Sequence, residues 1–233
     1  IYCSISAYGR SGAYASRAGY DQVVQAESGF MSLNGYPGME PLRTPLAMID
    51  LTTGMFAAHA VLAALYAREA NGRGQYIEVA LFDNAFGLTG FFTMNYLVTG
   101  ENPPPPGNSS PVAAPVGVFH AADGRFFMTV AGQGVWRKLL DVLGNPPELL
   151  GADFADNVAR VQHERQLAQI LGRLFGQAPL AHWIARLRDG GVPAGPIRSI
   201  AEAVTSPEVK ERAILGAAPH TKAGEVPNLR LPL

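Results

Sequence analysis

Residues 45–75 read PLAMIDLTTGMFAAHAVLAALYAREANGRGQ: a short apolar lead-in, one carboxylate, a long apolar run and a Gly-rich end. Apolar residues recur through the run at helical spacing, and the positions between them are mostly Ala, Val or Leu. This pattern predicts a helix that is apolar on nearly every side, and such a helix is usually buried. Asn71 to Gly74 ends it, with Arg68 in the last turn as the helix dipole prefers. We therefore expect a buried core helix that starts near Asp50.

Asp50 lies where the apolar lead-in meets the helix, and two roles are open to it. As a helix cap, its side-chain oxygens accept the first free backbone N–H groups, which is the commoner role of an Asp before a helix. As a nucleophile, it is held ionised by the positive end of the helix and is kept from water by burial. The residues alone leave both roles open, and the second makes Asp50 the candidate catalytic residue.

The composition predicts a core-rich globular protein, since 48% of the 233 residues are hydrophobic and 16% are charged. With 18 basic and 19 acidic residues, the formal net charge of −1 gives no electrostatic reason to expect nucleic acid or an anionic membrane as a partner. No apolar run is judged long enough to span a bilayer. The single cysteine, Cys3, fits a reducing compartment, so we expect a cytoplasmic location.

Alternating strands and helices predict an α/β fold for the first hundred residues. Ile1–Ser6 is expected to be a strand, and residues 75–81 alternate apolar and polar side chains as a second strand. A short helix is expected to end at Ser28-Gly29, and a second apolar helix is expected to start with Asp83 as its cap and to run through Tyr96. Because the chain begins inside a strand pattern, we expect a fragment that lacks the N-terminal part of this domain.

The stretch GENPPPPGNSS, residues 100–110, interrupts every periodicity and predicts a stiff connector. The expected segments are residues 1–100 as part of a large domain, 101–110 as a linker, 111–210 as a small α+β domain and 211–233 as a segment returning toward the large domain. Asp123-Gly124 between two apolar runs predicts a β-hairpin in the small domain. Helices are expected there at 133–143, 164–175, 180–187 and 201–204.

The common phosphate, metal and hydrolase motifs are not found in the sequence. Gly132-Gln133-Gly134 begins like a dinucleotide fingerprint, but Arg137 stands where the third glycine belongs. The five histidines are scattered and no Cys/His pair has metal-ligand spacing, so no metal site is predicted. Arg17 flanks a Gly-rich loop, where a guanidinium can pair with a phosphate, although a solvated charge is the commoner meaning.

Short motifs follow one another along nearly the whole chain: Ile1–Ser6 with Tyr8-Gly9, Arg17-Ala18-Gly19-Tyr20-Asp21, Asp50-Leu51-Thr52-Thr53-Gly54, Gly72-Arg73-Gly74-Gln75, Gly107-Asn108, and Gly191-Val192-Pro193-Ala194-Gly195-Pro196. In this order they resemble the family III CoA-transferases. That group also includes the carnitine–CoA transferases and the α-methylacyl-CoA racemases. Together the motifs indicate the family, but they do not indicate a substrate.

The resemblance implies a Rossmann-like large domain, whose N-terminal part this chain would lack, a small α+β domain and an interlocked homodimer. It places the family's catalytic aspartate on Asp50, which would attack an acyl-CoA donor and then carry CoA as an aspartyl-CoA thioester. Coenzyme A is then a co-substrate and a carboxylic acid is the acceptor, with no covalently bound cofactor. Backbone N–H groups near Gly54 or in adjacent loops would stabilise the oxyanion. The other positions expected to contact CoA or substrate are Arg17, Tyr20, Gly107 and Asn108.

Two alternatives to CoA transfer stay open. The first is an α-methylacyl-CoA racemase or a CoA-ester dehydratase on the same scaffold. The racemase branch has a His at the position of Tyr20, and a Tyr is a poor base near neutral pH, which favours transfer. The second is a catalytically inactive fragment that binds CoA or forms a dimer, because part of the CoA site is expected to be missing.

Overall fold

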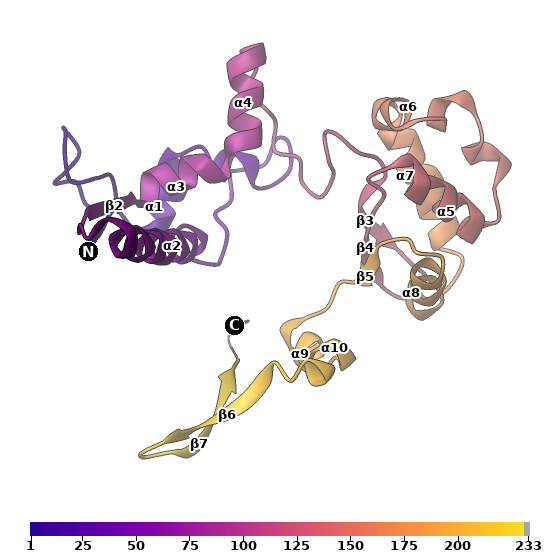
Figure 1. Cartoon of the computed structure of the whole chain (residues 1–233). Coiled ribbons are helices and arrows are strands. Elements are labelled where there is room, and N and C mark those ends of the chain that lie inside the picture. Colours follow the sequence, from indigo (N-terminus) through magenta and orange to yellow (C-terminus); the bar gives the residue numbers. More distant parts are fainter. Residues whose placement is uncertain (231–233) are drawn as a thin grey trace. The chain divides into compact units, whose positions relative to one another are not determined.

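The computed structural model describes residues 1–230. It divides into two compact units, Ile1–Gly107 and the residues from Asn108 onward, and the division falls within the stretch 101–110. Figure 1 shows the helices and strands of both units. The helices and strands of the first unit are β1 (Tyr2–Ser6), α1 (Asp21–Glu27), the short 3-10 helix η1 (Met31–Leu33), α2 (Met48–Asn71), β2 (Tyr76–Ala80), α3 (Leu81–Leu88) and α4 (Gly90–Thr99).

The first unit is built on a parallel pair of strands. β1 and β2 pair in register from Tyr2 opposite Tyr76 to Ser6 opposite Ala80. Parallel strands need a long connection, and α2 provides it while packing against both strands. The two predicted strands are therefore confirmed, as is the short helix α1, which ends at Ser28. A small core of Val24, Ile49 and Ala85 lies between α1, α2 and α3.

The prediction that α2 is buried on nearly every side is wrong for the described chain. Only Ile49, Thr53, Ala57 and Ala64 are buried, and their spacing makes one narrow stripe. Large apolar side chains on its other faces are exposed, among them Phe56 at 56% and Leu62 at 64%. The elements that pack against α2 in the described part of this unit are the two-stranded sheet and the short helices α1 and α3. They cover one stripe and leave the rest of the helix uncovered.

The length of α2 also corrects the statement that no apolar run could span a bilayer. By length and composition alone, Met48–Asn71 is long and apolar enough to do so, and 22% of its most apolar window is buried in the described chain. One such helix is weak evidence for a membrane span, because core helices of water-soluble proteins pass the same test.

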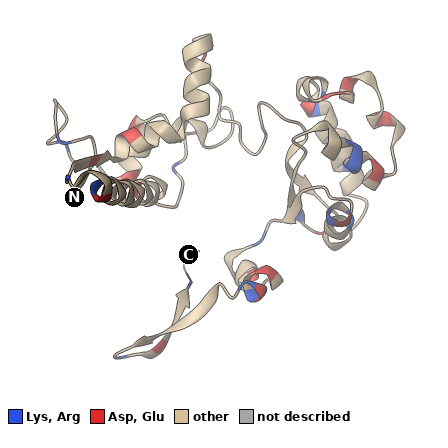
Figure 2. Ribbon diagram, in the orientation of Figure 1, with Lys and Arg blue, Asp and Glu red and all other residues tan. Residues whose placement is uncertain are grey.

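The second apolar helix is two helices rather than one. α3 ends at Leu88 and α4 begins at Gly90, with the Thr89 hydroxyl donating to the carbonyl oxygen of Phe86 at 2.8 Å. Asp83 lies in the first turn of α3 and does not cap it, contrary to the prediction. The ten residues of α4 include no Lys, Arg, Asp or Glu, whereas each of the other α-helices among residues 1–230 carries at least one (Figure 2).

The second unit contains the predicted hairpin and four predicted helices. Its elements are β3 (Val116–His120), β4 (Arg125–Thr129), α5 (Gln133–Leu143), the 3-10 helices η2 (Pro147–Leu149) and η3 (Ala152–Phe154), α6 (Asn157–Gln162), α7 (Glu164–Phe175), α8 (Leu180–Asp189), β5 (Ala194–Pro196), α9 (Ile200–Val204), α10 (Pro207–Glu211), β6 (Leu215–His220) and β7 (Gly224–Leu229). The helices expected at 133–143, 164–175, 180–187 and 201–204 correspond to α5, α7, α8 and α9. β3 and β4 pair antiparallel across Asp123-Gly124 as predicted.

A dense core holds the second unit together. Phe119, Phe126 and Phe175 contact one another at ring-centroid distances of 5.0 to 5.9 Å, and Trp183 packs edge-on to Phe175 at 5.1 Å. Such aromatic contacts stabilise a core beyond the area they bury. This unit therefore has its own hydrophobic core, as an independent domain requires.

Two pairings in the second unit were not predicted. β5, which is Ala-Gly-Pro, joins the edge of β4 where only a loop was expected, because tertiary contact rather than β-propensity orders it. β6 and β7 form an antiparallel hairpin from Leu215 opposite Leu229 to His220 opposite Gly224. The two strands consist mostly of small residues and prolines, so the alternation of apolar and polar side chains that predicts a strand is weak in them.

Candidate active site

The N-terminus of α2 is capped by a side chain from another helix, and Asp50 is not the cap. Asp50 is the third residue of α2, and the residue at the N-cap, Ala47, has no side chain that can accept a hydrogen bond. Instead, Oδ2 of Asp21 in α1 accepts from the backbone N–H of Ile49 at 2.7 Å and from that of Asp50 at 3.1 Å. The capping role considered for Asp50 is therefore wrong, because Asp21 fills it.

Asp21 is itself held by a buried network. It is 1% exposed, and its Oδ1 accepts from Nε2 of the fully buried Gln25. Gln25 is in turn fixed by Thr44 in the loop before α2: its Oε1 accepts from the Thr44 N–H at 2.9 Å and its Nε2 donates to the Thr44 hydroxyl at 3.2 Å. Buried polar groups that are fully hydrogen-bonded rigidify their surroundings. α1 and this loop therefore fix the first turn of α2.

The carboxylate of Asp50 is left without a partner. Within residues 1–230 its side chain makes no hydrogen bond or ion pair, and the residue is exposed. Partial burial of the carboxyl, followed by the negative charge of Asp21, raises its pKa above the ordinary value. The expectation that the helix end favours the ionised form is wrong here, because partial burial and the charge of Asp21 raise the pKa. The expectation that burial shelters the residue is also wrong for the described chain, because Asp50 is exposed.

Asp50→Asn is expected to raise the melting temperature near neutral pH by about 1–2 °C. The raised pKa means that the folded chain holds the proton of Asp50 more tightly than the unfolded chain does. The stability it contributes is therefore fully present below the unfolded pKa of 3.8 and is lost as the pH rises through the higher folded pKa. Thermal unfolding of both proteins at pH 7 and pH 3.5 checks this. A variant that melts below the wild type at pH 7 would contradict it.

Asn84 holds the first turn of α2 from the other side, and the sequence analysis missed it. Its Nδ2 lies 3.2 Å from the Ile49 carbonyl oxygen and 2.7 and 2.9 Å from the hydroxyls of Thr52 and Thr53. Its Oδ1 is buried and has no hydrogen-bond partner among residues 1–230. The available signal was one amide residue following Asp83 within an otherwise apolar helix, which by itself does not indicate a supporting role.

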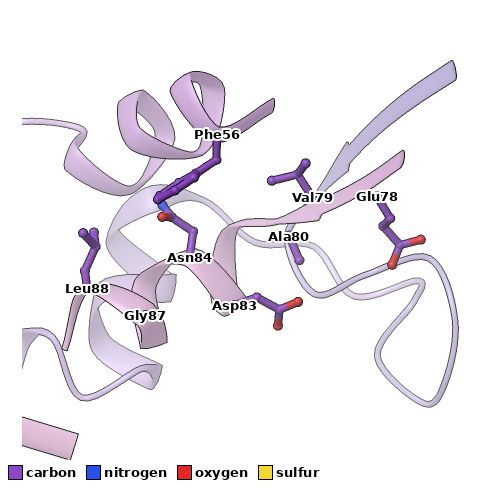
Figure 3. Close-up of a pocket in the computed structure, with 8 residues that line it drawn as sticks. All are labelled: Phe56, Glu78, Val79, Ala80, Asp83, Asn84, Gly87 and Leu88. Atoms are coloured by element: carbon purple, nitrogen blue, oxygen red, sulfur yellow. The ribbon is translucent and has the colours of Figure 1, made fainter. Parts of the chain in front are cut away.

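Asn84 also lines a pocket of about 390 Å³ on the first unit (Figure 3). The pocket is formed by α2, β2 and α3, and its lining residues are Phe56, Glu78, Val79, Ala80, Asp83, Asn84, Gly87 and Leu88. Most of these are apolar, and the carboxylates of Glu78 and Asp83 add negative charge. Asp50 does not line this pocket, although Asn84 connects the pocket to the turn that carries Asp50.

In the structure Arg17 has an acidic partner and Tyr20 is exposed. The guanidinium of Arg17 pairs with the carboxylate of Glu27 and lies 4.8 Å from the ring centroid of Tyr8. Tyr20 precedes α1, is 75% exposed and immediately precedes Asp21 in sequence. Tyr20 is therefore close to the Asp21 network along the chain, whereas Arg17 already has an acidic partner. Phosphate binding by Arg17 and substrate contact by Tyr20 stay predictions.

Gly54 lies one turn after Asp50 on α2, inside the helix. Its own N–H is therefore within the helical hydrogen-bond ladder and is not a free donor. Oxyanion stabilisation by other backbone N–H groups near Gly54 or in adjacent loops stays a prediction. A Cβ built on Gly54 would meet no atom of the described residues within 4 Å. Because residues four apart share a helix face, this glycine leaves open space on the side of Asp50.

Gly107 and Asn108 lie at the division between the two units. The Gly107 N–H donates to the Gly35 carbonyl oxygen at 2.8 Å, and its φ of +61° suits glycine. The carbonyl oxygen of Asn108 lies 3.5 Å from the Cβ position of Gly117 in the second unit. Gly107 thus closes a loop of its own unit, and contact of either residue with CoA stays a prediction.

Gly107→Ala is expected to destabilise the first unit by about 1–3 kcal/mol. The added Cβ would lie 2.4 Å from two ring carbons of Tyr36, at a backbone conformation that L side chains rarely adopt. Gly54→Ala is the matched control, since its Cβ would meet open space in a helix interior. Calorimetric unfolding of both variants checks this. Equal melting temperatures for Gly107→Ala and the wild type would show that the loop yields without cost.

Groups of three or more His, Cys, Asp or Glu side chains that could hold a metal ion do not occur among residues 1–230. The start of α2 combines the Asp50 carboxylate, which has no partner within residues 1–230, with the supporting side chains of Asp21 and Asn84 and with open space beside Gly54. A carboxylate so placed can act as a nucleophile or as a proton acceptor.

Comparison with known proteins identifies the family. The family model described as CoA-transferase family III matches residues 1–233. The chain belongs to CoA-transferase family III. A succinate–glutarate CoA-transferase of Agrobacterium fabrum is 35% identical to this family III chain over 233 residues, which are 100% of the chain and 58% of that protein. An acetyl-CoA:oxalate CoA-transferase of Acetobacter aceti is 34% identical, over 92% of this chain and 56% of that protein.

Solved structures of family III relatives share the fold. A CaiB/BaiF family protein from Brucella suis superposes with a TM-score of 0.80 at 37% identity, over 100% of this chain and 60% of that chain. Rv3272 from Mycobacterium tuberculosis superposes with a TM-score of 0.87 at 27% identity, over 100% of this chain and 62% of that chain. The family and the mixed α/β fold are thus confirmed, and the family III chain spans about 60% of the length of these relatives.

Proposed function

We propose that the protein transfers CoA from an acyl-CoA donor to a carboxylic acid through an aspartyl-CoA thioester on Asp50. One observation carries the proposal: in a chain of this family, the Asp50 carboxylate is held by a fixed backbone and has no partner of its own among residues 1–230. A carboxylate engaged in an ion pair would have to break that pair before it could attack. Asp50 needs no such step.

The proposed reaction moves CoA from the donor acid to the acceptor acid through acyl intermediates on Asp50. An Asp50 oxygen attacks the thioester carbonyl carbon, the C–S bond breaks, and CoA leaves as a thiolate, so that a mixed anhydride forms between Asp50 and the donor acid. The thiolate then attacks the Asp50 carbonyl carbon and releases the donor acid as its carboxylate, which leaves an aspartyl-CoA thioester. The acceptor carboxylate attacks this thioester, CoA leaves again as a thiolate, and a second mixed anhydride forms between Asp50 and the acceptor. The thiolate then attacks the acceptor carbonyl carbon of this anhydride, which gives the new acyl-CoA and restores the Asp50 carboxylate.

The finer architecture is part of the same proposal. We place Asp50 in a Rossmann-like large domain of a cytoplasmic, interlocked homodimer. The exposed apolar side chains of α2 and α4 support this arrangement, because further protein surface would cover them. Such cover would also remove water from Asp50, as an anhydride intermediate requires.

Small dicarboxylic acids are the proposed substrate class. The names of the A. fabrum and A. aceti relatives include succinate, glutarate and oxalate. Purified full-length protein should transfer CoA from succinyl-CoA to glutarate or oxalate, with the new thioester separated by liquid chromatography. Transfer to none of these acids or to a wider carboxylic acid panel would refute CoA transfer. Exchange of the acyl-CoA α-proton with deuterated water, without any acceptor, would instead favour the racemase alternative.

A further inference from the structure

We propose that Asp21 is the positioning residue for Asp50: it holds the backbone of the nucleophile and, with its own charge, makes the Asp50 carboxylate more reactive. The inference rests on the proposed function of Asp50. It adds a residue that does not touch the substrate and acts only through Asp50.

The geometry ties Asp21 directly to Asp50. A single oxygen of Asp21 accepts from the N–H of Asp50 and from that of its neighbour Ile49. The N–H of Met48 donates to the Leu46 carbonyl oxygen, and the N–H of Leu51 makes the first intrahelical bond, to the Ala47 carbonyl oxygen. Ile49 and Asp50 lie in the first turn, where backbone N–H groups have no partner within the helix, so both of their N–H groups depend on Asp21.

The burial of Asp21 makes this contact a fixed one. Asp21 is 1% exposed, and no Lys, Arg or His within residues 1–230 forms an ion pair with it. Its donors are therefore the two backbone N–H groups and the amide of Gln25. A buried carboxylate that lost these donors would be strongly destabilised, so the first turn of α2 and Asp21 hold each other in place.

The same contact affects the charge of Asp50. Two carboxylates lie at one helix terminus, and the backbone donors are taken by the buried one. The ionised form of Asp50 is disfavoured by partial burial and by the field of Asp21, which raises its pKa. A more basic carboxylate is a better nucleophile, and forming an anhydride or thioester removes its charge and so relieves the repulsion. Asp21 thus favours the acylated states over the free carboxylate.

Other charged groups do not account for this effect. The elements packed against α2 carry Glu27 on α1, Glu78 on β2 and Asp83 on α3, and α2 itself carries His59, Arg68 and Glu69, while Arg43 lies in the preceding loop. Asp21 is the charged group among the described residues whose field raises the pKa of Asp50. Removing its charge is therefore the specific test.

The test compares Asp21→Asn with Asp21→Glu in the full-length protein. The Asn variant keeps an accepting oxygen but loses the charge, so the acidic limb of the kcat/KM pH profile should move to lower pH, with a plateau kcat about 10-fold lower. The Glu variant keeps the charge on a longer side chain, so its limb should stay near that of the wild type while kcat still falls. A merely structural Asp21 would lower kcat without moving the limb.

An acidic limb that stays in place or rises in Asp21→Asn would overturn the inference. If melting curves show that neither variant folds, the wild-type profile decides, because its acidic midpoint should lie above the ordinary aspartate pKa of 3.8. A midpoint at or below that value would also overturn it. Full activity of Asp50→Asn would refute the proposed function itself. Loss of activity in that variant together with an unmoved limb in Asp21→Asn would refute the role of Asp21 alone.

Discussion

Asp50→Asn should lower kcat for CoA transfer by at least about 10³-fold, because an amide does not replace a carboxylate as the attacking group. The fold should survive, since the residue is exposed and only its backbone N–H takes part in the Asp21 network. KM for the acyl-CoA should change little if Asp50 acts after binding. The measurement is steady-state CoA transfer with circular dichroism as the check on folding.

Glu69→Gln provides the matched control for this prediction. Glu69 is an exposed carboxylate near the other end of α2, and its only ion pair within residues 1–230 is a loose 3.9 Å contact with Arg68. Its neutralisation should leave kcat within about twofold of the wild type. Comparable losses in both variants would mean that general charge on α2, and not the nucleophile, sets the rate.

Arg160→Ala is expected to destabilise the second unit by about 3–5 kcal/mol. Arg160 is fully buried; its Nε donates to the Ala114 carbonyl oxygen at 2.8 Å and its Nη1 to Gln133 Oε1 at 2.9 Å. Its guanidinium also lies 4.7 Å from the ring centroid of Trp136. Truncation would leave these buried acceptors unpaired and open a cavity beside the indole.

Arg173→Ala is the control, because this arginine is exposed and pairs with Glu148 on the surface at 2.8 Å. It should cost no more than about 1 kcal/mol. Both tryptophans of the chain, Trp136 and Trp183, lie in the second unit, so tryptophan fluorescence in urea reports the unfolding of that unit. Similar midpoints for the two variants would show that the buried guanidinium contributes no more than a surface ion pair.

The elements that the sequence predicted well are those with local determinants. β1, β2, α5, α7 and the β3–β4 hairpin each carry their own periodicity or turn chemistry, and that signal does not depend on distant residues. β5 lacks such a signal, since Ala-Gly-Pro forms a strand only because β4 lies beside it. The exposure of α2 could not be predicted for a related reason. The composition of α2 shows which side chains could be buried, but their burial also depends on what packs against the helix. The described residues cover only one stripe of it.

The candidate site shows the same limit. Asp50 was singled out from its position before an apolar helix and from the family resemblance, but its surroundings depend on contacts distant in sequence. Asp21 lies 29 residues away from Asp50 and takes the backbone donors that a local argument assigned to Asp50 itself. Asn84 reaches the same turn from 31 to 35 residues away. Partial burial of the Asp50 carboxyl and then the charge of Asp21 raise the Asp50 pKa, so the local prediction of a favoured ionised form had the wrong sign.

Trapping the acylated enzyme tests the central claim most directly. Full-length protein is incubated with acyl-CoA and hydroxylamine, digested and analysed by mass spectrometry, with Asp50→Asn treated in parallel. Attack of hydroxylamine on an Asp50 thioester or anhydride should leave a hydroxamate on Asp50, and the variant should show none there. A protein that turns over acyl-CoA while Asp50 stays unmodified, or that carries the hydroxamate on another carboxylate, would contradict the account.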